Sequence, residues 1–129
     1  MIGQIPANQK KYIQTTYKLQ GYNYLVLKEY NSAIDAFNKA IKVNSGSSFN
    51  KASIYHGIAQ SYFEQNNINK TLKYGKEALE EELDNDVAEN LYFILAYSYR
   101  IKGKADKEEY FIEKLKAINP DSQFLKKLS

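Results

Sequence analysis

Four residue columns recur three times along this chain with the same internal spacing. A tyrosine is followed after four residues by a small residue, after three more by a second tyrosine, and after sixteen more by Ala or Leu. The columns are Tyr17/Tyr55/Tyr92, Gly21/Ala59/Ala96, Tyr24/Tyr62/Tyr99 and Ala40/Ala78/Leu115. The units recur at intervals of 38 and then 37 residues, and such a period indicates a repeat protein.

A spacing of four and then three residues places side chains on one stripe of an α-helix. Each unit therefore begins with a helix, and the small residue on its stripe lets a second helix approach closely. A short polar turn follows at residues 28–31, 65–67 and 102–104. In the first unit the second helix carries its apolar residues at helical spacing, as Ala33, Phe37, Ala40 and Ile41. The sequence predicts an all-α fold of three helical pairs.

These residues resemble the tetratricopeptide repeat family over roughly residues 14–122. The first unit matches best, with Tyr17, Gly21, Tyr24, Tyr30, Ala33, Phe37 and Ala40, and the third ends on Asn119-Pro120. The second is weaker, because Thr71 and Gly75 stand where an alanine and an aromatic are usual. The resemblance implies one domain, an α-solenoid of three antiparallel helix pairs in a right-handed superhelix. We place its repeats at about 14–47, 52–85 and 89–122, with a C-terminal cap at 121–129.

The period is longer than the 34 residues usual for this family. We expect the extra residues at 45–50, as a loop, and near 82–86, where they would prolong a helix. Residues 1–13 lead into the first helix, with Pro6 in its first turn. Residues 121–129 are expected to form a short capping helix with Asp121 or Ser122 as its N-cap. Its residues Phe124, Leu125 and Leu128 would pack down on the preceding helices.

The resemblance implies a scaffold that binds partner proteins and performs no catalysis. In the family, ligand contacts come from positions one residue after each packing position of the first helices, on the concave side of the array. Here these positions are Lys18, Tyr22, Leu25, His56, Gln60, Phe63, Phe93, Tyr97 and Arg100. Many are aromatic or apolar, and an exposed patch of that kind marks an interaction site. We expect the partner to be another protein or a peptide segment with apolar anchors.

Burial is the alternative reading of these aromatic residues. The six column tyrosines are expected in the core, whereas Tyr22, Phe63, Phe93 and Tyr97 suit either the core or the groove. The C-terminal helix could fold back over the groove, or self-association could cover it. A self-associating structural or assembly protein, which would form a homo-oligomer, is therefore the alternative function.

A subset of the family binds the acidic C-termini of chaperones through a carboxylate clamp. Of the five clamp positions only Lys18 matches. The other four are held by Tyr22, Gly57, Asn90 and Ile94. The chain is therefore not expected to belong to that subset.

Composition bears on the other classes of function. The chain has no cysteine and one histidine, His56, whereas zinc sites use three or four ligands. No phosphate loop or nucleophile–base pair is present. We therefore expect no enzyme, catalytic residue, cofactor or metal. The net formal charge of +3 motivates nucleic-acid binding, but the basic residues do not cluster on one helix, so we expect none. The acidic run from Glu77 to Glu89 is read as a solvated face, or as a surface for a basic partner.

The same composition bears on location. No apolar run approaches the roughly 18 residues that a membrane helix needs, so no membrane insertion is expected. The N-terminus has no apolar segment typical of a signal peptide. A cytoplasmic location is expected, although a signal removed beforehand would leave no trace.

Overall fold

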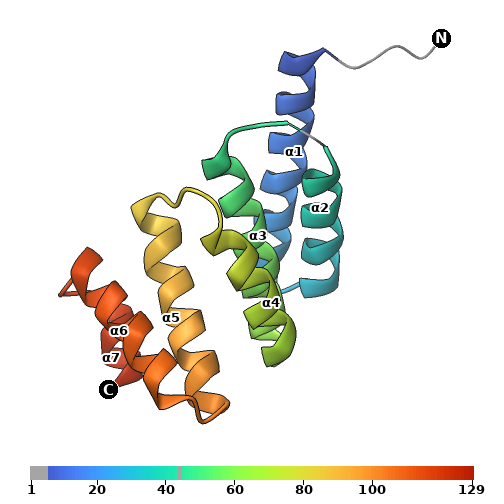
Figure 1. Ribbon diagram of the computed structural model, residues 1–129. Coiled ribbons are helices and arrows are strands. Elements are labelled where there is room, and N and C mark those ends of the chain that lie inside the picture. Colours follow the sequence, from blue (N-terminus) through green and yellow to red (C-terminus); the bar gives the residue numbers. More distant parts are fainter. Residues whose placement is uncertain (1–5, 44) are drawn as a thin grey trace.

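The computed structural model describes residues 6–43 and 45–129, and these form α-helices and turns without a strand (Figure 1). The helices are α1 (Ala7–Val26), α2 (Tyr30–Lys42), α3 (Ser48–Glu64), α4 (Ile68–Leu79), α5 (Asn85–Ile101), α6 (Ala105–Ile118) and α7 (Gln123–Leu128). Helices α1 and α2, α3 and α4, and α5 and α6 pack as successive pairs, and α7 packs on α5 and α6. The predicted all-α solenoid with a short C-terminal helix is confirmed.

The three helical pairs share one kind of turn. The N–H groups of Glu29, Asn67 and Lys104 each donate to a tyrosine carbonyl oxygen at 2.9 Å, those of Tyr24, Tyr62 and Tyr99 respectively. The residue before each donor has a positive φ, namely Lys28 (60°), Asn66 (61°) and Gly103 (71°). This combination is the Schellman motif, which ends a helix by satisfying its last carbonyl groups. The second tyrosine column therefore marks the ends of the first helices.

The links between pairs differ from the expected ones. Helix α4 ends at Leu79 and does not continue through residues 82–86, so the expected prolongation is wrong. The reason is the side chain of Asp84, which accepts a hydrogen bond from the N–H of Val87 at 2.9 Å and caps α5. In the other link, the loop expected at 45–50 is shorter than predicted, because Ser47 caps α3 in the same way and residues 48–50 are already helical. Helix α1 already begins at Ala7, after Pro6, and Ser122 caps α7.

The core is aliphatic more than tyrosine-based. Of the six column tyrosines expected in it, only Tyr99 is fully buried, at 6% exposure. The others are half-buried along the edge of the core, because a phenol is amphipathic and its hydroxyl is best kept where it can meet water or a polar partner. The largest fully buried apolar side chains are Phe37, Ile54, Ile58, Leu91, Ile94, Leu95 and Leu115.

Candidate functional site: the surface of the first helices

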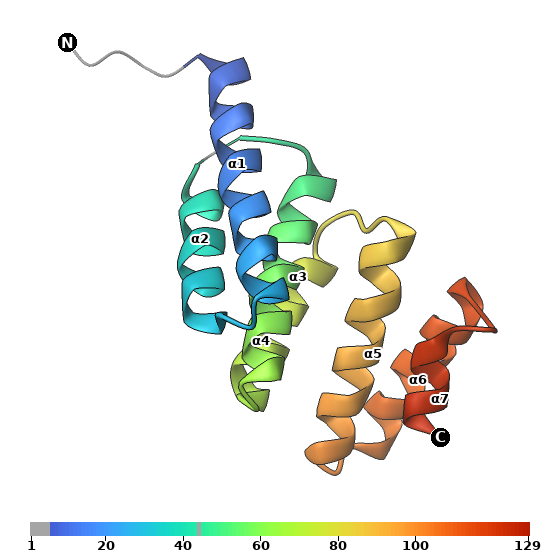
Figure 2. The same ribbon diagram turned by 180° about the vertical axis from the view of Figure 1, so that it is seen from behind.

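All nine residues predicted to bind a partner lie on α1, α3 and α5, the first helices of the three pairs. We call the surface they form the first-helix surface. Figure 2 shows α7 lying alongside α5 at one end of this array. The structure divides the nine residues into a polar part, a part covered by α7, and an accessible part.

The polar part begins at Lys18, which links α1 to α3. Its ammonium group donates to Oδ1 of Asn50 at 2.7 Å. The amide of Asn50 in turn donates to Gln14. Gln14 is fully buried and donates to the carbonyl oxygens of Ala40 at 3.1 Å and Val43 at 2.9 Å. Burial lowers the pKa of Lys18. Lys18 therefore has a structural role, because its hydrogen bond joins α1 to α3.

A chain of hydrogen-bonding groups crosses α1, α3 and α5 through His56. The hydroxyl of Tyr22 lies 2.5 Å from the carbonyl oxygen of Ser53, to which it donates, and 3.1 Å from Nδ1 of His56. Nε2 of His56 lies 2.6 Å from Oδ1 of Asn90. In a neutral imidazole with its proton on Nε2, Nε2 donates to Asn90, and the single phenolic proton of Tyr22 is then shared between the carbonyl oxygen of Ser53 and Nδ1.

Burial shifts the pKa values of the two titratable groups in this row of hydrogen bonds, His56 and Tyr22. It lowers the pKa of His56, which is fully enclosed, because the charged imidazolium is poorly solvated there. It also raises the pKa of Tyr22 to about 12. Both side chains therefore stay neutral around neutral pH. His56 is buried and so is not accessible to a partner in this structure, although it lies on the predicted face.

Helix α7 covers the C-terminal part of the surface. Phe124 stacks on Phe93 with ring centroids 4.9 Å apart, and Lys127 lies over both rings. Phe93 is buried as a result. It also contacts Phe63 and Tyr97, at centroid distances of 6.1 Å each. The alternative in which the C-terminal helix folds back over the groove thus holds for Phe93.

Arg100 anchors the same helix. Its Nε donates to Glu108 of α6 at 2.6 Å, and its Nη2 donates to the carbonyl oxygen of Leu128, at the end of α7. A positive charge at a helix C-terminus is favourable because the carbonyl groups there carry partial negative charge. Arg100 therefore holds α7 in place rather than standing free for a ligand.

The accessible part contains the remaining four predicted residues, Leu25, Gln60, Phe63 and Tyr97. Phe63 and Tyr97 meet edge to face at 5.6 Å, and Tyr97 is 36% exposed. A cavity of about 300 Å³ lies beside Gln60, between the C-terminal ends of α1 and α3. It is lined by Tyr22, Leu25, Val26, Lys28, Tyr30, Gln60 and Glu64.

Sequence reasoning missed the residues that hold this surface together. Asn90 entered the analysis only as a departure from the clamp pattern, yet it bonds His56. Asn50 and Gln14 carried no repeat signal at all. Gln14 aligns with Ala52 and Asn50 with Tyr12 in the neighbouring repeat, and the two polar side chains meet only once α1 and α3 pack together.

Two searches of the described residues bear on other functions. No three His, Cys, Asp or Glu side chains in residues 6–43 and 45–129 converge as a metal site. Within the same ranges no helix has the length and apolar character needed to cross a membrane.

Comparison with known proteins gives one match. The family model described as Tetratricopeptide repeat matches residues 16–46, which span most of α1, all of α2 and the start of the link to α3. No curated protein matches the chain. The matched pair is followed by two further helical pairs with the same turn geometry and the same residue columns. The match to the first pair and the architecture of successive helical pairs together fit a tetratricopeptide repeat assignment.

Proposed function

We propose that this protein binds a segment of a partner protein at the accessible part of the first-helix surface. Tetratricopeptide repeats generally mediate protein–protein interaction. The observation that carries the proposal is the aromatic pair of half-buried Phe63 and exposed Tyr97, in edge-to-face contact at 5.6 Å. Val26, which is 82% exposed, adds apolar surface at the rim of the neighbouring cavity.

The chemistry of this part favours an apolar anchor with polar flanks. Aromatic side chains dominate the binding energy of protein interfaces when they sit near the centre of the contact. Gln60 and Glu64 line the cavity from α3 and offer hydrogen bonds to the flanks of the segment. His56 and Phe93 are closed off, so the partner contacts the C-terminal ends of the first helices.

The test compares two exposed tyrosines. Tyr97→Ala removes the anchor contact, whereas Tyr110→Ala removes a tyrosine that is 56% exposed on α6, away from this surface. We expect proteins captured by the wild type and by Tyr110→Ala to be lost with Tyr97→Ala, with affinity falling at least about tenfold. The readout is affinity capture with mass spectrometry, followed by titration of the captured partner.

The fold of each variant is checked by helical circular dichroism and thermal unfolding. Identical sets of captured proteins for all three forms would remove the binding role of Tyr97.

A second candidate function is self-association, and the outer face of α1 favours it. Tyr12 and Leu19 lie seven residues apart on this face and are 75% and 55% exposed. The residues at the register of Leu19 in the other first helices are Gly57 and Ile94, and both are buried. Helices α3 and α5 use this face to contact the preceding pair. On α1, which has no preceding pair among the described residues, the same face is exposed. A second copy of the chain would cover it.

Sedimentation velocity over a range of protein concentrations tests this candidate. We expect a concentration-dependent dimer that Leu19→Glu disperses and Tyr110→Ala leaves intact. A monomer at every concentration would exclude self-association through α1.

A further inference from the structure

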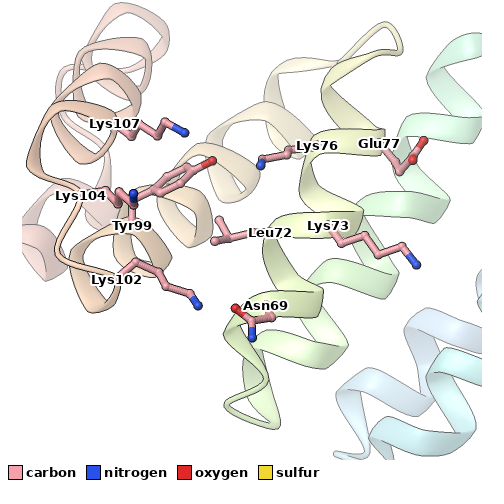
Figure 3. Close-up of a pocket in the computed structure, with 9 residues that line it drawn as sticks. All are labelled: Asn69, Leu72, Lys73, Lys76, Glu77, Tyr99, Lys102, Lys104 and Lys107. Carbon is pink, nitrogen blue, oxygen red and sulfur yellow. The ribbon is translucent and has the colours of Figure 1, made fainter.

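A second candidate surface lies between α4 and the helices α5 and α6. It is a cavity of about 600 Å³ lined by Asn69, Leu72, Lys73, Lys76, Glu77, Tyr99, Lys102, Lys104 and Lys107 (Figure 3). It opens among the second helices, so it is separate from the accessible part of the first-helix surface. We call it the lysine seam.

Helix α4 carries a glycine where α2 carries a large residue, so the two joints between repeats are packed differently. Gly75 occupies the register that Phe37 holds in the first repeat. The backbones of α4 and α6 are not close neighbours, which leaves room for a cavity between their outer ends. Leu72 and Tyr99 form its floor from α4 and α5 (Figure 3).

Five lysines from three parts of the chain surround this space. Lys73 and Lys76 come from α4, Lys102 and Lys104 from the turn after α5, and Lys107 from α6. In Figure 3 the ammonium groups of Lys76 and Lys107 point into the space around Tyr99. The carboxylate of Glu77, the single acid of the lining, points away from it, as does the ammonium group of Lys73.

Their charges are not neutralised within the fold. Among the described residues no ion pair involves any of these five lysines. A cleft lined by one sign of charge concentrates its field and attracts the opposite charge. The seam is therefore complementary to an anionic ligand.

A neighbouring cavity indicates what kind of anion fits. It measures about 640 Å³, shares Asn69 and Lys102 with the seam, and adds Gln65, Asn66, Asn67, Ile68 and Ile101. Side-chain amides both donate and accept hydrogen bonds, so they suit the alternating N–H and C=O groups of a peptide backbone. Carboxylates would meet the lysines at one end, and the backbone would meet the amides at the other.

The aromatic ring in the seam is unsuited to nucleic-acid bases. Tyr99 is 6% exposed. One face of its ring stacks on Phe111 at 5.9 Å, and the ammonium of Lys107 lies 5.3 Å from its centroid. Binding of single-stranded nucleic acid relies on aromatic faces on which bases stack, and Tyr99 offers none.

We propose that the lysine seam binds an acidic, extended peptide segment of a partner protein. This goes beyond the first-helix surface and gives the chain a second docking site, with charge rather than aromatic anchoring as its main attraction. The affinity is expected to fall with rising salt, because contacts between exposed charges are screened.

The experiment uses a fluorescein-labelled peptide in which Asp alternates with Ala, and a control peptide with Asn in place of each Asp. Binding is followed by fluorescence anisotropy at low and high salt. The test variant is Lys76→Glu/Lys102→Glu, which reverses one charge on each wall of the seam. The control is Lys11→Glu/Lys42→Glu, which makes the same change of net charge at exposed lysines of α1 and α2.

We expect the Asp peptide to bind and the Asn peptide not to. Affinity for the Asp peptide should fall about tenfold or more in the test variant and change little in the control. Equal losses in both variants would show attraction to net charge alone and overturn the proposal. So would a lack of binding at low salt, or a tighter complex with an oligouridine of equal charge. Phe63→Ala should leave binding of the Asp peptide intact, which separates this site from the first-helix surface.

Discussion

The two interfaces between successive repeats, here called the first and the second seam, are built in opposite ways. In the first, the large residue comes from the second helix: Phe37 of α2 is fully buried between Gly21 of α1 and Gly57 of α3. A methyl group added to either glycine would lie within 2.7 Å of the phenyl ring. The aromatic ring thus fills the space that both glycines leave open.

In the second seam the large residues come from the following first helix. Gly75 of α4 stands at the register of Phe37, and Leu95 of α5 packs against it, so that an added Cβ would lie 2.7 Å from Cδ2 of Leu95. Ile94 stands at the register of Gly57. The large and the small residue have changed places between the two helices, so the helices stay at packing distance with different residues in contact.

This exchange has a consequence for binding. A ring inserted from the second helix fills the first seam, and a leucine from the following first helix fills the space at Gly75 in the second. The lysine seam lies beside this second contact and is lined by neither Gly75 nor Leu95. The same repeat architecture therefore gives two different seams. The second has a cavity beside it, lined by lysines that form no ion pair among the described residues.

The largest predicted effect is Phe37→Ala. It should lower the free energy of unfolding by about 3–5 kcal/mol, because the glycines on both sides cannot fill the cavity left behind. Leu95→Ala should lower it less, by about 2 kcal/mol, because a leucine side chain is smaller than a phenyl ring and leaves a smaller cavity. Urea unfolding followed by circular dichroism measures both values. A loss at Leu95 as large as that at Phe37 would contradict the distinction between the seams.

The two glycines should respond differently to alanine. Gly57→Ala places a Cβ 2.3 Å from Cζ of Phe37, a ring held by packing on all sides, and should destabilise by about 1–3 kcal/mol. Gly75→Ala meets the end of the flexible Leu95 side chain, and it gains about 1 kcal/mol of helix propensity. Its net effect should be close to zero in the same unfolding experiment. Equal destabilisation would show that the second seam is as rigid as the first.

The periodic features of the fold could be predicted from the sequence. The tyrosine columns place the first helices, and the polar turns place their ends, because both depend on spacing along one helix or on local turn chemistry. Phe37 could be assigned to the apolar stripe of its helix for the same reason, but not to the joint between repeats. The partner of Gly75 could not, because Leu95 lies outside the columns and its contact depends on how two pairs stack.

The candidate site was predictable in register but not in accessibility. All nine positions lie on the first helices, as the columns require. Whether each is open depends on distant residues: His56 is enclosed through Tyr22 and Asn90, and Phe93 through Phe124. These contacts join residues about 34 positions apart for His56 and 31 for Phe93. No local pattern encodes them.

His56, whose hydrogen bonds link α1, α3 and α5, should make the free energy of unfolding depend on pH. The pKa of His56 in the folded state lies below its ordinary value, so the unfolded chain binds more protons in mildly acidic solution. Stability is therefore complete above about pH 6.5 and falls as pH drops toward the lowered pKa, by at most about 1.4 kcal/mol per pH unit. Unfolding at pH 7 and pH 5.5 measures this. His56→Gln should flatten the dependence, and an unchanged slope in that variant would assign it to other groups.

The smallest predicted effect separates two serines at one register of the two seams. Ser61 of α3 donates to the carbonyl oxygen of Gly57 at 2.8 Å, whereas the hydroxyl of Ser98 of α5 is buried and has no hydrogen-bond partner among the described residues. An unsatisfied buried hydroxyl is unfavourable, so Ser98→Ala should raise the free energy of unfolding by about 0.5–1 kcal/mol. Ser61→Ala should lower it slightly or leave it unchanged. The difference between the two variants in urea unfolding is the measurement. If Ser98→Ala instead destabilises, the hydroxyl has found a partner, such as water entering from the open side of the second seam, and the openness of that joint would extend to its core.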